Sequence, residues 1–182
     1  MTSDEDLVRR CWSGDRGAFE LLFTRHRDSV FNIALRISGN RELAEDITQD
    51  AFVRAYLGLS SFRGQAKLST WLYRIAVNQA LRTKSVGSRR AEKEQGMDDL
   101  VLSSDSPGPE ESAERFEIET RVRRAIAELP PAQRAVIGLR YIEGLDLAEI
   151  AEITGSPLGT VKSRIHHALR SMSPALRDLR NE

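Results

Sequence analysis

The sequence "GLDLAEIAEITGSPLGTVKSRIHHAL", residues 144–169, predicts two helices joined by a tight turn. Asp146 and Glu149 have the D-x-x-E spacing of a capping box, in which side chains bond to the first free backbone amides of a helix. Gly155 is expected to end that helix, Ser156 to cap the next one, and Pro157 to occupy its first position, where a missing N–H costs nothing. A short helix, a turn and a second helix form the helix-turn-helix arrangement.

The second helix of this pair has an apolar side and a cationic side. At about 100° per residue, one stripe, which we expect to be buried, contains Leu158, Val161, Ile165, Ala168, Leu169 and Met172. The opposite face, flanked by Lys162 and Arg164, contains Thr160, Ser163, His166, His167 and Arg170. Such a face suits contacts with base edges and phosphates in a DNA groove, and an ordinary amphipathic surface helix is the alternative. Adjacent histidines cannot form a helical i,i+4 metal pair, so no metal site is expected.

Helical periodicity extends through most of the chain and predicts an all-α fold. The apolar spacing predicts helices over 17–37, over 41–59 with Asn40 as N-cap, and over 70–84 with Ser69 as cap, after a loop at 60–67. Further helices are expected over 113–129 and 132–144. Residues 87–111 lack a sustained apolar face and are rich in acidic residues, Ser, Pro and Gly. The sequence therefore predicts two small helical domains, 1–86 and 112–182, joined by a flexible acidic linker.

Charge is strongly segregated along the chain, although the 27 Lys and Arg residues balance the 27 Asp and Glu residues. Residues 53–91 contain eight cations and no acid, and residues 92–119 contain ten acids and two cations. An acid-free block of this kind creates a local positive field suited to phosphate, or else forms a solvated basic face. The sequence therefore points to nucleic acid as a partner in spite of its zero net charge.

Several other classes of protein are excluded by composition. Apolar runs are far shorter than the ~20 residues that a membrane span needs, and the acidic start "MTSDEDLVRR" is unlike a secretory signal. Cys11 is the single cysteine, so an internal disulfide and a cysteine zinc cluster are excluded, and a small hydrophobic role is favoured over a redox role. We expect a cytoplasmic protein with no cofactor and no membrane insertion.

Two motif blocks in this order resemble the extracytoplasmic-function sigma factors of the sigma-70 family. The segment from Leu129 to Leu169, with the pattern G-x-x-x-x-E-I-A-x-x-x-G-x-P-x-G-T-V-K-S-R from Gly144 to Arg164, is similar to their C-terminal domain. Independently, "NRELAEDITQDAFVRAY" and "FRGQAKLSTWLYRIAVN" look like their N-terminal domain. The resemblance implies a non-enzymatic initiation subunit that binds core RNA polymerase, contacts promoter DNA as a single strand at −10 and as a duplex at −35, and is controlled by an anti-sigma factor.

The resemblance also assigns roles to individual residues. It places Glu42, Asp46, Gln49 and Asp50 against the β′ clamp helices of the polymerase. Contact with the −10 strand would come from Phe62, Arg63, Lys67, Arg74 and Asn78, whereas Trp71 is expected to pack in the core. Contact with the −35 duplex would come from Thr160, Lys162, Ser163, Arg164, His166 and His167. The C-terminal domain would in addition contact the β flap.

The residues alone leave three other functions possible. A helix-turn-helix repressor or activator would explain residues 130–172 and leave 40–83 without a role. A nuclease using the carboxylates around Asp46 lacks a phosphate-binding glycine loop, a triad or a metal cluster. A protein-interaction adaptor does not explain the acid-free basic block. Substitution of Asp46 and Gln49 separates these functions, because only a sigma factor would lose polymerase binding.

Overall fold

The computed structural model describes residues 2–87 and 109–178, and all regular structure within them is helical. In the N-terminal half these are α1 (Asp4–Trp12), α2 (Arg16–Ser38), α3 (Arg41–Gly58), the 3₁₀ turn η1 (Leu59–Ser61) and α4 (Leu68–Gly87). In the C-terminal half they are α5 (Pro109–Ala127), α6 (Pro131–Ile137), the π-helical turn η2 (Gly138–Ile142), α7 (Leu147–Thr154) and α8 (Leu158–Asp178). The predicted all-α class is confirmed.

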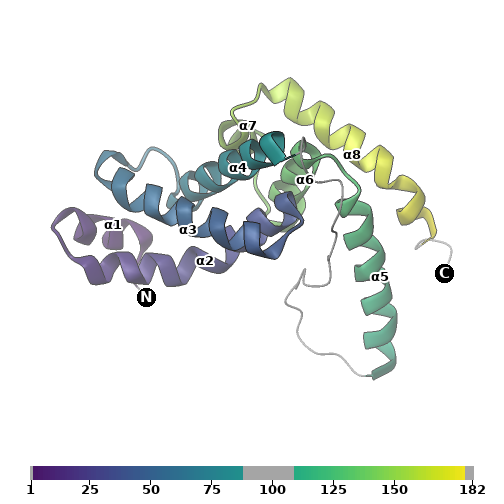
Figure 1. The fold of residues 1–182 in the computed structure, drawn as a ribbon, viewed down its shortest axis with the longest axis horizontal. Coiled ribbons are helices and arrows are strands. Elements are labelled where there is room, and N and C mark those ends of the chain that lie inside the picture. Colours follow the sequence, from purple (N-terminus) through teal and green to yellow (C-terminus); the bar gives the residue numbers. More distant parts are fainter. Residues whose placement is uncertain (1, 88–108, 179–182) are drawn as a thin grey trace.

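The N-terminal half is a bundle built around α2, against which α1, α3 and α4 pack (Figure 1). Side-chain caps start three of its helices: Ser3 accepts from the Asp6 amide, Asp15 from Ala18, and Asn40 from Leu43. Gly39 ends α2 with a φ of +65°, a left-handed conformation that glycine adopts without strain. The predicted Asn40 cap is confirmed, and the tight turn that it shares with Gly39 places α3 alongside α2.

The C-terminal half contains the predicted helix-turn-helix, formed by α7 and α8 and supported by α5 and α6. Asp146 and Glu149 form the full capping box, and Gly155 ends α7 with a φ of +59°. Both predictions are confirmed. A small separate cluster of buried side chains joins α5, α6 and α8, and consists of Ala125, Ile126, Leu129, Ile137, Ala168 and Met172.

Helix starts differ from the predictions at two serines. α4 begins at Leu68 rather than after Ser69, because the Lys67 carbonyl already accepts the Trp71 amide at 3.2 Å. α8 begins at Leu158, and the Ser156 hydroxyl donates to the Thr154 carbonyl at 3.3 Å and accepts from Arg164 at 2.8 Å instead of capping the helix. α5 begins at Pro109, inside the segment expected to be linker; the rest of that segment, 88–108, lies outside the described residues.

The two halves share one hydrophobic core. Apolar side chains of the N-terminal bundle form a continuous buried cluster with Ala135, Val136, Leu139, Leu145, Ile150, Ile153 and Val161 of the C-terminal half. Figure 1 shows α6 and α7 lying against α4 where the halves meet, while α5 extends away from the bundle. The π-helical turn η2 contributes to this contact, because its Leu139 is fully buried.

Candidate functional site

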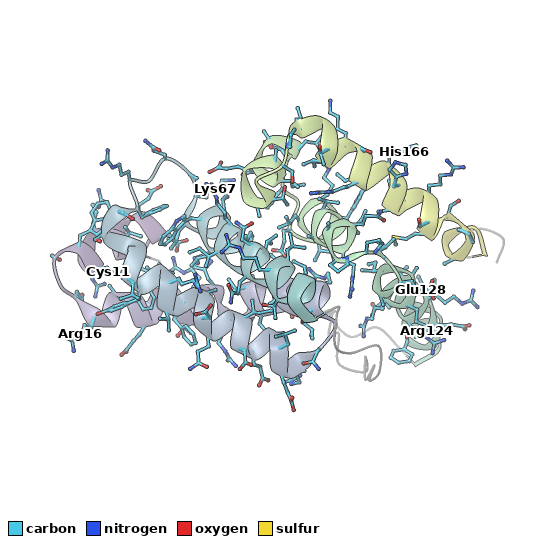
Figure 2. The ribbon with its side chains drawn as sticks, turned by 45° about the horizontal axis from the view of Figure 1, so that its top comes forward. Cys11, Arg16, Lys67, Arg124, Glu128 and His166 are labelled. Atoms are coloured by element: carbon cyan, nitrogen blue, oxygen red, sulfur yellow. The ribbon has the colours of Figure 1, made fainter. Side chains whose placement is uncertain are left out.

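The outer face of α8 presents the residues expected to read duplex DNA. Lys162, Ser163, His166 and His167 are exposed, and Thr160 is half-buried. Figure 2 shows His166 on the outer side of α8, directed away from the rest of the molecule. Arg164 differs from the others, because it is half-buried and its Nη1 donates to Ser156 at 2.8 Å. In this structure Arg164 therefore stabilises the turn between α7 and α8.

The apolar side of α8 is buried over only part of its length. Val161 and Ala168 are fully buried and Met172 is 5% exposed, as predicted, whereas Leu158 and Leu169 are 43% and 38% exposed, which contradicts the prediction for these two residues. Leu158 is the first residue of α8. Leu169 lines an apolar pocket of about 260 Å³ whose walls also include Val122, Arg123, Ile126, Ile137, Tyr141, Ile142 and Met172. The exposure of Leu169 is therefore part of a groove and not a packing defect.

The loop from η1 to α4 carries the aromatic and basic residues expected at single-stranded DNA. Phe62 is half-buried against Trp71, with ring centroids 5.1 Å apart, and Trp71 packs on the core as predicted. Arg63 is exposed. The Trp12 indole donates to the Leu59 carbonyl at 2.9 Å and so connects α1 to the base of this loop. Sequence reasoning gave Trp12 no role.

Lys67, which immediately precedes α4, is aligned with Arg74 and Asn78 of that helix, because residues seven and eleven positions apart share a helix face. That face is directed toward α7. Lys67 Nζ lies 3.6 Å from a Glu149 carboxylate oxygen, and Arg74 Nη1 lies 3.8 Å from one of Glu152. Figure 2 places Lys67 at the seam between α4 and α7. The structure thus places two of the expected −10 residues, Lys67 and Arg74, against the helix-turn-helix.

The exposed face of α3 combines acidic and apolar side chains. Glu42, Asp46 and Gln49 are exposed, and the half-buried Asp50 pairs with Arg54 at 2.9 Å. Val53 and Leu57, at 52% and 72% exposure, continue the same stripe and were missed by sequence reasoning. Their positions, seven and eleven residues after Asp46, could have revealed them. We name the set of Glu42, Asp46, Gln49, Asp50, Val53 and Leu57 the α3 stripe.

A buried polar network joins the halves at Glu143, and no sequence pattern indicated it. The Tyr73 hydroxyl donates to the Glu143 carboxylate at 2.8 Å, and Arg36 Nη1 lies 3.7 Å from the same carboxylate. Burial lowers the pKa of Arg36 below its usual range, although Glu143 opposes that shift. Burial, together with the charge of Glu143, raises the pKa of Tyr73. The neutral phenol of Tyr73 is therefore favoured while the halves are in contact.

Other chemistry is sparse in the described part of the chain. No cluster of His, Cys, Asp or Glu there could hold a metal ion, and no helix there is long and apolar enough to cross a membrane. Cys11 is half-buried against the core, and burial raises the pKa of its thiol, which disfavours the reactive thiolate.

Two family descriptions match separate parts of the chain. Residues 22–92 match sigma-70 region 2, and residues 119–172 match sigma-70 region 4. The first contains the α3 stripe and the loop that leads to α4, and the second contains the helix-turn-helix. The division agrees with the two motif blocks of the sequence.

Relatives of known identity match over nearly the whole chain. The ECF RNA polymerase sigma factor SigW of Bacillus subtilis is 37% identical over 179 residues, which cover 94% of this chain and 96% of the relative. The RNA polymerase sigma-H factor of Pseudomonas aeruginosa is 36% identical over 186 residues, which cover 98% and 96%. The structure of CnrH in complex with the cytosolic domain of CnrY superposes with a TM-score of 0.67 and 26% identity, covering 96% of this chain and 97% of that one. The chain therefore belongs to the extracytoplasmic-function sigma factors of the sigma-70 family, which are non-enzymatic transcription initiation factors, and contains their region 2 and region 4.

Proposed function

We propose that the α3 stripe is the surface that docks on core RNA polymerase, against the β′ clamp helices. Exposed Val53 and Leu57 supply apolar area at its C-terminal end, and Glu42, Asp46 and Asp50 supply negative charge along the rest of it. Protein interfaces commonly combine apolar contact area with polar and charged residues beside it. The acids would then steer a basic partner surface into place, and the apolar residues would contribute most of the affinity.

The loop after η1 and the exposed face of α4 are proposed to hold the −10 element as a single strand. Extraction of a base from its stack costs a few kcal/mol, and stacking on aromatic rings together with phosphate contacts can offset that cost. Phe62 offers a half-buried ring, and Arg63, Lys67 and Arg74 offer charge. Asn78 supplies an amide on the same face of α4.

Duplex contact at −35 is proposed for α8, through Thr160, Lys162, Ser163, His166 and His167, with Arg164 holding the turn in the free protein. We assign contact with the −10 element to the domain of residues 1–86 and contact with the −35 element to the domain of residues 112–182. The promoter elements lie about two helical turns apart, roughly 70 Å, so the two domains must separate on DNA. Weak sites joined on one chain gain affinity through effective concentration.

Two protein contacts are proposed for the C-terminal domain and the whole chain. The apolar pocket that Leu169 lines is suited to an apolar helix of the β flap, since Tyr141 and Ile142 beside it are also exposed. Control by an anti-sigma factor is supported by the structure of the sigma factor RpoE from Bartonella quintana in complex with NepR, to which the fold is similar with a TM-score of 0.64. We place the protein in the cytoplasm, where the polymerase is.

The observation that carries this function most directly is the acidic and apolar α3 stripe, because a DNA-binding repressor has no use for it. The test is run-off transcription by bacterial core polymerase on a randomised promoter library, with Asp46→Lys compared with Glu20→Lys. Glu20 is an exposed acid on α2 outside the stripe, so the two variants carry the same change in charge. Asp46→Lys should lower transcription and binding to core polymerase about tenfold or more, and Glu20→Lys should match the wild type.

Different results would separate the alternatives. If core polymerase stays inactive with the wild-type protein while the protein alone retains specific duplexes, the chain acts as a repressor or activator. If both lysine variants lose transcription equally, general charge rather than the α3 stripe determines docking.

A further inference from the structure

The apolar pocket that Leu169 lines, which we call the Leu169 pocket, has walls from both halves of the chain. Its volume is about 260 Å³, and most of its lining comes from α5, α6, η2 and α8. Arg36 of α2 completes the wall on the side of the N-terminal bundle. Leu169, Ile142 and Tyr141 are 38%, 40% and 59% exposed, so the pocket is open to solvent along these three side chains.

Two arginines that line this pocket have a buried nitrogen atom without an acceptor. Among the described residues, neither Arg36 Nη1 nor Arg123 Nε has a hydrogen-bond partner. The Arg36 side chain is 6% exposed, and its Nη1 lies 3.7 Å from a Glu143 oxygen, beyond hydrogen-bond distance. Arg123 donates through Nη2 to Glu119 at 3.2 Å, a bond that leaves its Nε unused. Since buried donors are normally paired, these two mark the wall as a place for an acceptor.

We propose that the Leu169 pocket binds a medium-chain carboxylic acid, with the hydrocarbon chain on the apolar walls and the carboxylate paired with Arg36 and Arg123. An apolar cavity of about 150 Å³ holds the six carbons of benzene, so about 260 Å³ suits a chain of roughly ten carbons. Removal of that chain from water supplies the driving force. A carboxylate suits the head group, because its bonds to a guanidinium are charge-assisted and can be bidentate.

The charges beside the two arginines favour an anionic head over a neutral one. Each guanidinium has five N–H donors, and neither Glu143 nor Glu119 occupies all of them. Burial lowers the pKa of Arg36 although Glu143 opposes the shift, so the charged form is only partly compensated. Protein atoms cover both unpartnered nitrogens, and the Arg123 side chain, at 24% exposure, would turn toward the ligand.

The ligand would share the pocket walls with the helix of the β flap proposed above. A hydrocarbon chain on Leu169 and Met172 leaves no apolar surface there for a protein helix. The acid should therefore lower transcription by the holoenzyme. This consequence rests on the proposed flap contact, whereas binding of the acid to the free chain does not.

Calorimetric titration of the full chain with sodium decanoate, without polymerase, tests the site. Binding should saturate at one molecule per chain with a Kd of about 0.1 mM, as expected for a ligand of this size. Leu169→Trp fills the pocket and should abolish binding. Leu158→Trp is the matched control, because Leu158 is 43% exposed and lies outside the pocket lining. Absence of saturable binding to the wild type, or equal effects of the two tryptophan variants, would overturn the proposal.

Comparison of decanoate with decanol tests the role of the carboxylate. Arg123→Leu should weaken decanoate binding about tenfold and leave decanol binding nearly unchanged, which also shows that the variant folds. Arg124→Leu makes the same change at an exposed neighbour on α5 outside this pocket and should keep the wild-type ratio of the two Kd values. An unchanged ratio in Arg123→Leu would overturn the assignment of the head group to this arginine.

Run-off transcription separates the site from its consequence. Decanoate at roughly ten times its Kd occupies about nine-tenths of the chains and should lower transcription by the wild-type holoenzyme several-fold. Arg123→Leu, measured against its own activity without the acid, should be less sensitive. If decanoate binds the free chain and transcription stays unchanged, the ligand site stands and the flap contact assigned to this pocket is wrong.

Discussion

Trp12 is largely exposed, yet it makes a specific hydrogen bond to another part of the chain. Its ring is 51% exposed, yet its indole N–H donates at 2.9 Å to the carbonyl of Leu59, the first residue of η1. Leu59 is itself nearly buried, and Phe62 follows three residues later. The bond therefore fixes the start of the loop that we assign to the −10 strand, from a helix 47 residues earlier in the sequence.

Trp12→Phe should destabilise the protein by about 0.5–1.5 kcal/mol, the usual net contribution of one hydrogen bond, and lower transcription from promoters that depend on the −10 element. Urea unfolding and run-off transcription measure the two effects. Tyr56→Phe is the control, because it also shortens an exposed aromatic side chain and should change stability by less than about 0.5 kcal/mol. Equal losses in the two variants would mean that the bond to Leu59 does not position the loop.

Burial of single residues was predictable where a helix packs along its whole length and not where it passes a groove. Val161, Ala168 and Met172 of α8 are buried as the apolar spacing predicts. Leu158 and Leu169 belong to the same stripe and are exposed, because Leu158 lies at the helix start and Leu169 faces a pocket. Periodicity identifies the apolar side of a helix, but the partner that covers it depends on other elements.

Helix boundaries were predictable where the signal is local. The Asn40 cap and the Asp146–Glu149 box use side chains next to the amides that they satisfy, and both form. Ser69 and Ser156 did not act as caps. Leu68 is 6% exposed, and α4 begins at this buried residue, ahead of Ser69. Arg164, eight residues after Ser156, bonds to the Ser156 hydroxyl. At Ser156 a contact from outside the local capping segment decided the outcome.

Asp146→Ala should lower the free energy of unfolding by about 1–2 kcal/mol, because the amides of Ala148 and Glu149 lose their acceptor. The helix-turn-helix would be affected most, so retention of −35 duplexes should fall. Chemical unfolding and a duplex gel-shift assay measure these changes. Asp28→Ala removes an exposed acid from the interior of α2 and is the matched control. A loss of duplex binding without a loss of stability would instead place Asp146 at the DNA.

At the scale of the whole molecule, the sequence indicated two surfaces but not their relation. The acid-free block at 53–91 and the cationic α8 predicted two regions for nucleic acid, and the family match agrees with both. Nothing in the sequence pattern showed that α7 would lie on α4, or that Arg36 would be 6% exposed beneath Glu143. Contacts between elements that are distant in the sequence carry no periodic signal, so the packing of the two halves on each other became evident only from the structure.

Tyr73 makes this arrangement sensitive to alkaline pH. Its pKa is raised by burial and by Glu143, so the folded protein keeps the phenol neutral above the pH at which the unfolded chain ionises. The contribution of Tyr73 is therefore fully present below about pH 10 and is lost as the pH rises through the folded pKa. The loss approaches about 1.4 kcal/mol per pH unit, because an ionised phenolate would face the Glu143 carboxylate 2.8 Å away.

Tyr73→Phe should therefore be less stable than the wild type near pH 8 by about 1 kcal/mol, the net contribution of the lost hydrogen bond, and the difference should narrow above about pH 10. Urea unfolding between about pH 8 and pH 11 measures both parts. Tyr141→Phe, at a tyrosine 59% exposed to solvent, should follow the wild-type curve and corrects for the other groups that titrate there. Parallel curves for wild type and Tyr73→Phe would mean that the phenol ionises alike in both states. The bond to Glu143 would then not hold the two halves of the folded chain together.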